Sequence, residues 1–453
     1  MAGGTKAGRG AAARAVGVGL IGFGTIGKGV AKVLARNAAV IEQRLGFPLR
    51  LVRIADLDTE TDRGVDLTGI RFDADADGLL ADPSVDIAIE LIGGYGAARR
   101  ITLAAIAAGK HVVTANKALL ALHGAEIFEA AKAKGVDVAF EASVGGGIPI
   151  LRSLREGLAA NVIESVHGIL NGTTNYVLTE MERTGEAFEV VLERAQELGY
   201  AEADPTFDVD GIDAAHKLSL LTAMAYGARL TFEEIPTEGI RGLVPLDFEM
   251  AEEFGYRIKL LGIAKRVVGA DGGERIDARV HPTMVPRSSL LASVDGAMNA
   301  VAVCGNAVGP TLFYGAGAGE LPTASAVVAD LMEIAREIRR SGGGRVAPLS
   351  YEPDQLVAKP MLPPGELEGR CYLRFAAVDE PGVLARITGA LGARRVGIES
   401  AYQGRRAASA SAASVIVLTH PAREAAVREA LAEIDALSDV IEPTRLIRIE
   451  EEL

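Results

Sequence analysis

Acidic side chains and one lysine gather between Glu202 and Lys217, a stretch that reads Glu-Ala-Asp-Pro-Thr-Phe-Asp-Val-Asp-Gly-Ile-Asp-Ala-Ala-His-Lys. Small and apolar residues predict a helix over 214–226, and Asp213 and Lys217, four residues apart, would share one face of it. A lysine that is partly desolvated there can donate a proton near neutral pH. An ordinary ion pair at the start of a helix explains the spacing equally well, so both interpretations stay open.

A glycine pattern near the beginning of the chain suits a dinucleotide. Gly22, Gly24 and Gly27 follow an apolar run and precede a helical pattern, and such glycines let the main chain approach a pyrophosphate at a helix N-terminus. The next predicted strand, 49–55, ends at Asp56, whose carboxylate suits a ribose 2′-hydroxyl and would repel the 2′-phosphate of NADP. We therefore expect NAD or NADP, with NAD favoured, unless Asp56 only caps a turn.

Two further predicted strands end in residues that suit a ligand. The strand over 85–92 ends at Gly93, and the strand over 111–115 leads to Lys117. Ligands of parallel sheets bind at the carboxyl ends of the strands. We therefore expect Lys117 where cofactor and substrate meet, rather than as an ordinary surface lysine of a loop.

Two polar turns contain glycine and stand next to predicted elements. The glycines 145–147 follow Glu141, and main-chain carbonyls freed by glycine could bind a monovalent cation together with that carboxylate. A glycine hinge between domains is an equally good explanation. Gly172 and Thr173 precede a predicted helix over 176–184, so their N–H groups and hydroxyl could bind a carboxylate, although an ordinary helix cap needs the same residues.

The elements that position these residues predict an α/β chain of several domains, as its 453 residues require. Strands that alternate with helices indicate a Rossmann-type parallel sheet, and the C-terminal pattern strand-helix-strand-strand-helix-strand is ferredoxin-like. The expected parts are a disordered tail (1–15), a nucleotide domain (16–142, joined by 310–341), an α+β substrate and dimerisation domain (143–309), a linker (342–366) and a regulatory domain (367–453).

Composition excludes several classes of protein. The net charge of −13 argues against a nucleic-acid partner, and the chain has no uncharged apolar run long enough to span a membrane. The two cysteines, Cys304 and Cys371, lie far apart without metal-ligand spacing, which favours a reducing, cytoplasmic location. Neither cysteine has a neighbouring base, so an aldehyde dehydrogenase that acts through a thiohemiacetal is disfavoured.

Four motifs, in order, resemble homoserine dehydrogenases of the bacterial type with a C-terminal ACT regulatory domain, from residue 16 onward. They are Gly-Lys-His-Val-Val-Thr-Ala-Asn-Lys117, Glu141-Ala-Ser-Val-Gly-Gly-Gly-Ile-Pro149, Gly168-Ile-Leu-Asn-Gly-Thr173, and Gly199-Tyr-Ala-Glu-Ala-Asp-Pro205 continuing through Lys217. The resemblance implies NAD(P)-dependent interconversion of L-aspartate 4-semialdehyde and L-homoserine by a homodimer or homotetramer, in threonine, methionine and isoleucine biosynthesis.

The resemblance also implies roles for individual residues. Lys217 would be the general acid and Lys117 a second active-site lysine. The substrate would contact Glu202, Asp213, Thr173, Gly172, Tyr200 and Asp208. The cofactor would contact Gly22, Gly24, Thr25, Ile26, Gly27, Asp56, Gly93, Lys117, Gly199, Glu202 and Gly319. A sodium ion would be bound by Glu141 and the carbonyls of Val144, Gly146 and Ile148. An amino-acid effector, threonine, would bind near Asp379, Pro381 and Gly382.

Some alternatives stay open at this point. The acidic residues after Asp56 stand where many relatives carry basic ones, which puts the use of NADP in doubt. The ACT domain could pair subunits without an effector. An oxidoreductase for another small amino-acid aldehyde, or a non-catalytic amino-acid sensor, would share parts of the pattern. The sensor would leave Lys117 and Lys217 without a purpose.

Overall fold

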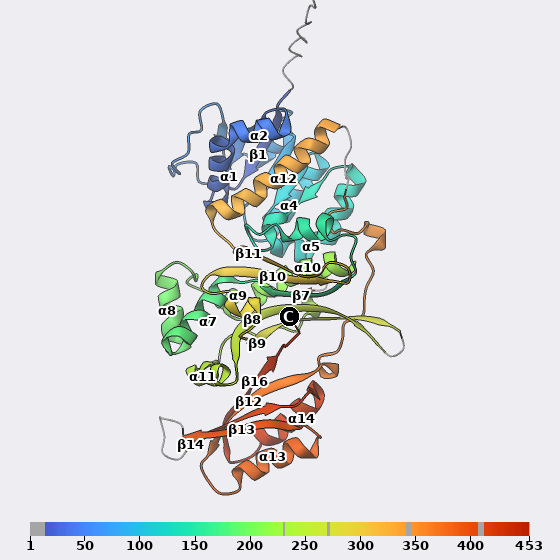
Figure 1. Cartoon of the computed structure of the whole chain (residues 1–453). Coiled ribbons are helices and arrows are strands. Elements are labelled where there is room, and N and C mark those ends of the chain that lie inside the picture. Colours follow the sequence, from blue (N-terminus) through green and yellow to red (C-terminus); the bar gives the residue numbers. More distant parts are fainter. Residues whose placement is uncertain (1–13, 230–231, 270–271, 341–345, 406–411, 453) are drawn as a thin grey trace, which may run out of the picture. The chain divides into compact units, whose positions relative to one another are not determined.

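The computed structural model describes residues 14–229, 232–269, 272–340, 346–405 and 412–452 (Figure 1). Apart from residues 14 and 15, the expected N-terminal tail lies outside these ranges. The chain forms two compact units, which are described here one after the other. The first unit comprises residues 1–160, 223–230 and 315–357, and the second comprises 161–222, 231–314 and 358–453.

The first unit is built on a six-stranded parallel sheet. Its strands are β1 (Val16–Ile21), β2 (Leu49–Ala55), β3 (Arg71–Asp73), β4 (Ile87–Glu90), β5 (His111–Thr114) and β6 (Val138–Ala139). Their order in the sheet is β3-β2-β1-β4-β5-β6, and the neighbouring strands pair in parallel. This is the strand order of a dinucleotide-binding Rossmann fold. All six residues of β1 are buried, as expected for a central strand covered on both faces.

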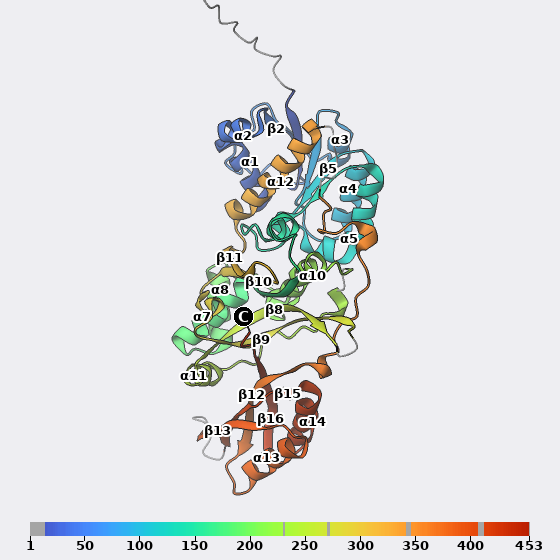
Figure 2. The same cartoon turned by 45° about the vertical axis from the view of Figure 1, so that its right-hand side comes forward.

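Helices cover the parallel sheet. They are α1 (Thr25–Arg36), α2 (Ala38–Leu45), α3 (Ala76–Ala81), α4 (Gly96–Ala107), α5 (Lys117–Lys134) and α12 (Glu320–Arg340). Figures 1 and 2 show α12 beside α1. A Cβ on Gly29 would come 2.5 Å from the carbonyl oxygen of Glu320, so only glycine permits this approach. The late segment around α12 therefore completes the core of the nucleotide-binding unit.

The second unit is built on a long mixed sheet. Its first strands are β7 (Ile163–Ile169), β8 (Tyr256–Val268), β9 (Glu274–Pro286), β10 (Met298–Gly305) and β11 (Gly309–Ala316), in the order β11-β10-β7-β8-β9. Helices of this unit are α7 (Gly172–Thr184), α8 (Phe188–Glu197), α9 (Thr206–Val209), α10 (Ile212–Tyr226, whose last turn counts with the first unit) and α11 (Pro245–Glu253).

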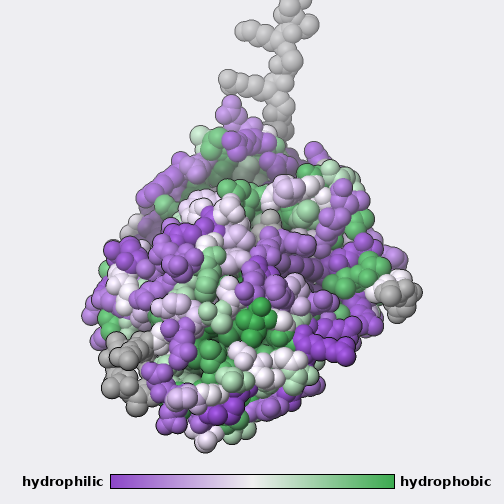
Figure 3. Space-filling view, turned by 60° about the horizontal axis from the view of Figure 1, so that its bottom comes forward, coloured by the Kyte–Doolittle hydropathy of each residue, from purple (hydrophilic) through white to green (hydrophobic). Residues whose placement is uncertain are grey.

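The C-terminal module has the predicted ferredoxin-like order. It consists of β12 (Glu368–Val378), α13 (Val383–Ala393), β13 (Ile398–Arg405), β14 (Ala412–Thr419), α14 (Glu424–Asp435) and β16 (Val440–Ile449), with the short β15 (Ala422–Arg423). Strand β16 lies at the edge of the module and pairs in parallel with β9, where Arg448 faces Thr283 and Ile449 faces Met284. The module and the strands β7 to β11 thus form one continuous sheet. Figure 3 shows hydrophobic areas separated by hydrophilic residues on the end of the molecule seen from below.

Several element bounds differ from the prediction. Helix α7 begins at Gly172 instead of 176, because the side chain of Asn171 caps it by accepting a hydrogen bond from Thr174 N at 2.8 Å. The strands β7 and β8 and the helix α11 were not predicted from the sequence. β8 is buried through most of its length and contains a buried lysine, which obscures its period. No helix within the described ranges is long and apolar enough to cross a membrane.

Candidate functional site

Lys217 forms the expected pair with Asp213, but inside the protein. Its Nζ donates to Asp213 Oδ2 and to the carbonyl oxygen of Leu170, both at 2.7 Å, and the residue is only 9% exposed. Helix α10 supplies both side chains on one face, and the end of β7 supplies the carbonyl. The ion pair at a helix start, which was the alternative explanation of this spacing, is therefore present, and it is nearly buried.

Asn171 joins two carboxylates to the α7 cap. Its Nδ2 donates to Asp208 Oδ1 at 2.7 Å and to Asp213 Oδ2 at 2.8 Å, while its Oδ1 caps α7. Burial, followed by the charge of Asp213, raises the pKa of Asp208. No role was predicted for Asn171 from the sequence. Its place before Gly172 was a signal, since an asparagine cap can still donate from its amide while its oxygen accepts.

The proposed substrate residues Thr173 and Tyr200 also meet. The Thr173 hydroxyl donates to the carbonyl oxygen of Tyr200 at 2.6 Å, and the Tyr200 ring stacks on Tyr176 with 4.5 Å between centroids. Glu202 is exposed, and its carbonyl oxygen accepts a hydrogen bond from Gln196 at 2.9 Å. The structure thus brings four of the predicted side chains, Lys217, Asp213, Asp208 and Thr173, around the N-terminus of α7, and leaves the Glu202 carboxylate facing solvent.

The first unit contains a cavity of about 600 Å³ at the carboxyl ends of its strands. It lies where β1, β2 and β4 end, and its lining includes Gly22, Gly24, Asp56, Gly93 and Arg100. Gly22 has a φ of +96°, and a Cβ there would come 2.6 Å from the Leu91 carbonyl oxygen, so the turn requires glycine. Thr25 and Ile26 begin α1 directly after this turn. Size and position suit an extended dinucleotide.

Asp56 both lines the cavity and caps its turn. Its Oδ2 accepts a hydrogen bond from Phe23 N at 2.5 Å, and its Oδ1 accepts one from Asp58 N at 2.9 Å. The Arg63 guanidinium lies 3.7 Å from Asp56 and 3.1 Å from Asp58. The turn-capping alternative is therefore realised, and a cation stands beside the carboxylate that the sequence suggested would repel phosphate.

Lys117 is the first residue of α5 and follows the end of β5. It is partly buried, and the neighbouring Asn116 donates to the carbonyl oxygen of Gly94 while capping the helix through Leu119 N. Lys117 belongs to the first unit and Lys217 to the second. Gly199 and Gly319, the other proposed cofactor contacts, have φ values of +77° and +127° and end or precede a helix.

The Glu141 loop contains a buried carboxylate. Its oxygens accept hydrogen bonds from Leu151 N at 3.0 Å and Arg152 N at 2.8 Å, and burial raises the pKa of Glu141. A Cβ on Gly146 would come 2.4 Å from the Gly317 carbonyl oxygen. The loop carbonyls of Val144, Gly146 and Ile148 stand beside this carboxylate in sequence. Oxygen donors fit a hard monovalent cation, and the described residues hold no cluster of three His, Cys, Asp or Glu side chains.

The proposed effector residues form an exposed turn between β12 and α13. Asp379, Pro381 and Gly382 are exposed, and Asp379 Oδ1 accepts a weak hydrogen bond from Gln403 at 3.4 Å. Gly382 has a φ of +91° directly before α13. The N–H groups in the first turn of this eleven-residue helix, which have no partner within the helix, therefore lie next to these residues.

Neither cysteine is activated. Burial raises the pKa of Cys371 to about 12. Burial and the neighbouring Glu164 raise the pKa of Cys304, whose thiol lies 3.6 Å from that carboxylate. A thiolate nucleophile is the requirement of the thiohemiacetal route. The environments of both thiols therefore argue against an aldehyde dehydrogenase of that type.

Comparisons with known proteins cover nearly the whole chain. Family models match at residues 22–141 (homoserine dehydrogenase, NAD-binding domain), 149–332 (homoserine dehydrogenase) and 372–436 (ACT domain). The homoserine dehydrogenase of Neisseria gonorrhoeae is 48% identical over 435 residues, which is 96% of this chain and 98% of that one. That of Pseudomonas aeruginosa is 47% identical over 436 residues, 96% and 99% of the two chains.

Solved structures show the same likeness. A homoserine dehydrogenase from Thiobacillus denitrificans has a TM-score of 0.90 and 50% identity, and the match covers 97% of this chain and 99% of that one. A hyperthermophilic archaeal homoserine dehydrogenase in complex with NADPH has a TM-score of 0.58 and 25% identity, over 71% of this chain and 98% of that one.

Proposed function

This chain belongs to the homoserine dehydrogenase family, and we propose that Lys217 is the acid that protonates the substrate oxygen in its reaction. The enzyme interconverts L-aspartate 4-semialdehyde and L-homoserine with a nicotinamide cofactor. One observation carries the proposal: a nearly buried ammonium, held at 2.7 Å by Asp213, belongs to a network with Asn171 and Asp208 at the N-terminus of α7.

The chemistry requires a proton donor at one atom. When bound, the nicotinamide supplies or accepts the hydride. In the reducing direction the aldehyde carbon gains the hydride, and negative charge develops on its oxygen. Lys217 stabilises this charge and donates a proton to the oxygen, which gives the hydroxyl of homoserine. Asp213 holds the Nζ in place, and Asn171 holds Asp213 through a hydrogen bond of 2.8 Å. In the oxidising direction Lys217 accepts the proton.

The amino-acid end of the substrate carries an ammonium and a carboxylate. We assign the ammonium to Asp208 and Glu202, because carboxylates are its natural partners. We assign the carboxylate to the N–H groups of Gly172 and Thr173 at the N-terminus of α7. Lys117 is a second proposed active-site lysine, supported by its place at the carboxyl end of β5.

The test of this proposal compares three proteins. Lys217→Ala should lower kcat for homoserine oxidation by at least roughly a hundredfold, the usual scale of general acid-base catalysis. The matched control is Lys132→Ala, since Lys132 is an exposed lysine that pairs only with Glu352 and Asp354 in the described contacts. A Lys217→Ala enzyme that turns over at the wild-type rate would refute the assignment.

For the cofactor we propose a preference for NAD over NADP. It is supported by the Asp56 carboxylate in the lining of the cavity, and by the pairing of Arg63 with Asp56 and Asp58. A 2′-phosphate would have to break these pairs. The ratio of kcat/KM for the two cofactors tests the preference, and a ratio in favour of NADP would contradict it. Asp56→Ser should shift the ratio towards NADP, because it removes a carboxylate that would repel the 2′-phosphate while Arg63 keeps its pair with Asp58.

We also propose that a sodium ion binds the loop of Glu141, Val144, Gly146 and Ile148. The support is the set of oxygen donors and the fit of glycine at the tight turn. Sodium chloride should raise the unfolding temperature more than choline chloride at equal ionic strength. Glu141→Gln should remove this difference. Equal effects of the two salts on the wild type would contradict the ion.

For regulation we propose that threonine binds the turn of Asp379, Pro381 and Gly382 and inhibits the enzyme. The support is the ACT module and its contact with the catalytic region, where Arg428 and Arg448 lie 3.0 and 2.9 Å from Glu238. Threonine should lower turnover of the wild type, and Asp379→Ala should weaken this inhibition without changing uninhibited turnover. Absence of inhibition would favour a module that only pairs subunits.

We propose that the enzyme is a homodimer or homotetramer. Each subunit would consist of a nucleotide domain (16–142, joined by 310–341), a substrate and dimerisation domain (143–309) and an ACT domain (367–453). The long sheet of 143–309 and the edge of the ACT module are the supporting surfaces. Light scattering gives the mass in solution. A monomer that retains full activity would contradict this proposal.

A further inference from the structure

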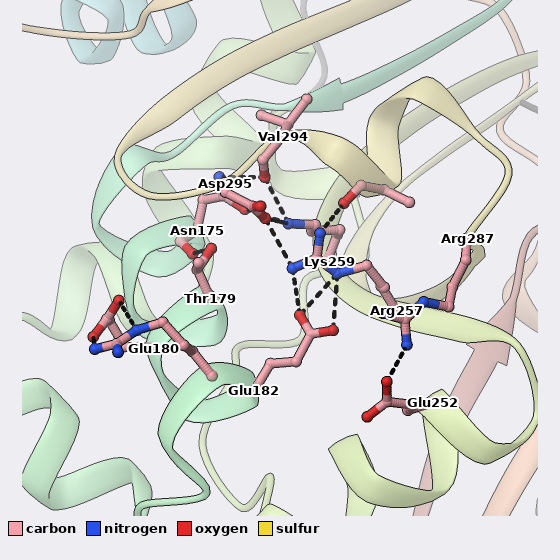
Figure 4. Close-up of polar contacts among 12 residues, drawn as sticks. Asn175, Thr179, Glu180, Glu182, Glu252, Arg257, Lys259, Arg287, Val294 and Asp295 are labelled. Carbon is pink, nitrogen blue, oxygen red and sulfur yellow. Dashed lines mark hydrogen bonds and ion pairs between the residues drawn. The ribbon is translucent and has the colours of Figure 1, made fainter.

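A lysine without a catalytic role is completely buried in β8. Lys259 is 1% exposed, and its Nζ donates to the carbonyl oxygen of Val294 at 2.6 Å. Longer contacts reach Asp295 Oδ1 at 3.3 Å and Asn175 Oδ1 at 3.4 Å (Figure 4). Two of these three partners belong to the connection before β10. Lys259 therefore fixes the connection before β10 from the side of β8.

Asn175 holds the same connection from the side of α7. Its Nδ2 lies 3.0, 2.9 and 3.1 Å from the carbonyl oxygens of Val294, Gly296 and Met298. One helical turn later, Thr179 Oγ1 accepts a hydrogen bond from Gly296 N at 3.1 Å. Every second carbonyl of residues 294–298 thus points at one buried amide. We call residues 294–298 the clamped loop.

The clamped loop packs against Gly172, which is part of the proposed substrate site. A Cβ added to Gly172 would come 2.8 Å from the carbonyl oxygen of Ala297, so this carbonyl lies directly against the first residue of α7. Asn299, which is 1% exposed, lies 3.6 Å from the same point. A shift of the loop therefore moves the N–H groups of Gly172 and Thr173.

A buried ammonium is an unusual way to hold a loop. Burial, followed by the charge of Arg257, lowers the pKa of Lys259 to about 8. Arg257 is itself paired with Glu182 and, at 2.8 Å, with Asp295. Replacing a whole buried ion pair with apolar residues of similar size is often neutral or stabilising for a fold, so a buried ion pair is weak evidence for a role in stability. A lysine at this place is better explained by geometry that the loop must keep than by stability.

We propose that Lys259, together with Asn175, is a positioning residue that fixes the clamped loop against Gly172 and so sets the N-terminus of α7 for the carboxylate of homoserine. The inference rests on the proposed function of that helix N-terminus. Lys259 contacts no substrate atom. It acts through the Val294 carbonyl group, the Asp295 carboxylate and the main chain of the clamped loop.

The test is a separation of kinetic constants. Lys259→Met keeps the length of the side chain but removes its donors. It should raise KM for homoserine by roughly tenfold or more, the effect of losing a hydrogen bond to a charged group. It should change kcat less than threefold and leave KM for the cofactor unchanged. A parallel fall in kcat with unchanged KM for homoserine would overturn the proposal.

A second variant guards against a protein that does not fold. Thr179→Val removes the acceptor of Gly296 N and also the hydroxyl that donates to the Asn175 carbonyl oxygen at 2.7 Å within α7. It should likewise raise KM for homoserine. Ile263→Val, which lies four residues further along β8, is the control for loss of packing and should leave KM unchanged. A KM increase in Ile263→Val as large as in Lys259→Met would reduce Lys259 to a structural residue and overturn the inference.

The role of Lys259 and the proposed function of Lys217 can be refuted independently of each other. If wild-type enzyme is active and Lys217→Ala is not, while Lys259→Met has the wild-type KM, only the inference fails. If Lys217→Ala turns over normally, the proposed function of the site fails, whatever Lys259→Met does.

Discussion

At the scale of the residue, the environment decides what a charged side chain does. Lys217 and Lys259 are both nearly buried lysines, yet one is anchored by a carboxylate and the other mainly by a carbonyl oxygen. The first is placed to transfer a proton and the second to hold main chain. Asp330 is a third buried ionisable side chain, in the first unit. Its Oδ2 accepts a hydrogen bond from Glu141 N at 2.8 Å.

Asp330 should make stability depend on pH. Burial, followed by the charge of Glu141, raises its pKa to about 8. The folded protein keeps this proton up to about pH 8, whereas the unfolded chain releases it near pH 4. The unfolding free energy should therefore fall as pH rises between these values, by at most about 1.4 kcal/mol per pH unit for this group. Asp330→Asn should flatten the fall.

Urea unfolding midpoints at pH 5, 6, 7 and 8 measure the slope. Asp66→Asn, at an exposed loop aspartate, is the control and should keep the wild-type slope. Identical slopes in Asp330→Asn and wild type would show that Asp330 ionises at an ordinary pH.

At the scale of the element, short segments position the site. Helix α9 carries Asp208 and has only four residues, so it depends on its neighbours. The connection before α11 supplies them, since Ile240 N donates to the carbonyl oxygen of Val209 at 2.8 Å. A Cβ on Gly239 would come 2.2 Å from that same carbonyl oxygen.

Gly239→Ala should therefore displace the end of α9 and, with it, Asp208. We expect KM for homoserine to rise roughly tenfold, which corresponds to about 1.4 kcal/mol of binding. KM for the cofactor should not change. The matched control is Gly369→Ala in β12, where a Cβ meets nothing within 4 Å. Steady-state kinetics that show the same KM in both variants would contradict the role of this connection.

At the scale of the whole molecule, the second unit joins the sheet of β7 to β11 to the ACT module. The strands β9 and β16 pair directly, and Glu450 N donates to the carbonyl oxygen of Met284 at 3.0 Å. Arg448 adds a buried ionic network, at 2.7 Å from Glu424 and 2.9 Å from Glu238. An effector in the module could thus bias the connection that supports α9, provided that it binds two states differently.

Breaking the ionic network should loosen both parts together. Arg448→Met removes one of the two arginines that pair with Glu424, which is 4% exposed and keeps Arg428 at 2.7 Å. The lost charge-assisted hydrogen bonds should lower the free energy of unfolding by about 1.5 to 3 kcal/mol. Hydrogen exchange should then rise in β9 as well as in β12 and β16. Arg423→Met, at an exposed position before α14, is the control. Faster exchange in β12 alone would indicate that the module opens independently.

The features that were predicted correctly from the sequence depend on local interactions, whereas those that were missed depend on contacts between distant residues. The glycine turn at Gly22 and the order of elements after residue 367 were predicted correctly, because turn chemistry and periodicity are local. The 3.6-residue period likewise placed Asp213 and Lys217 on one face. The strand β8 was missed, since its burial on both faces leaves no alternation to detect.

The sequence by itself determined the family, the kind of cofactor and the identity of the residues from which the site is drawn. Only the tertiary structure decided that the pair of Asp213 and Lys217 is buried, that Asn171 joins it to Asp208, and that Lys259 reaches the clamped loop. These contacts join residues that lie tens of positions apart. Their geometry depends on how strands and helices pack, which no local pattern encodes.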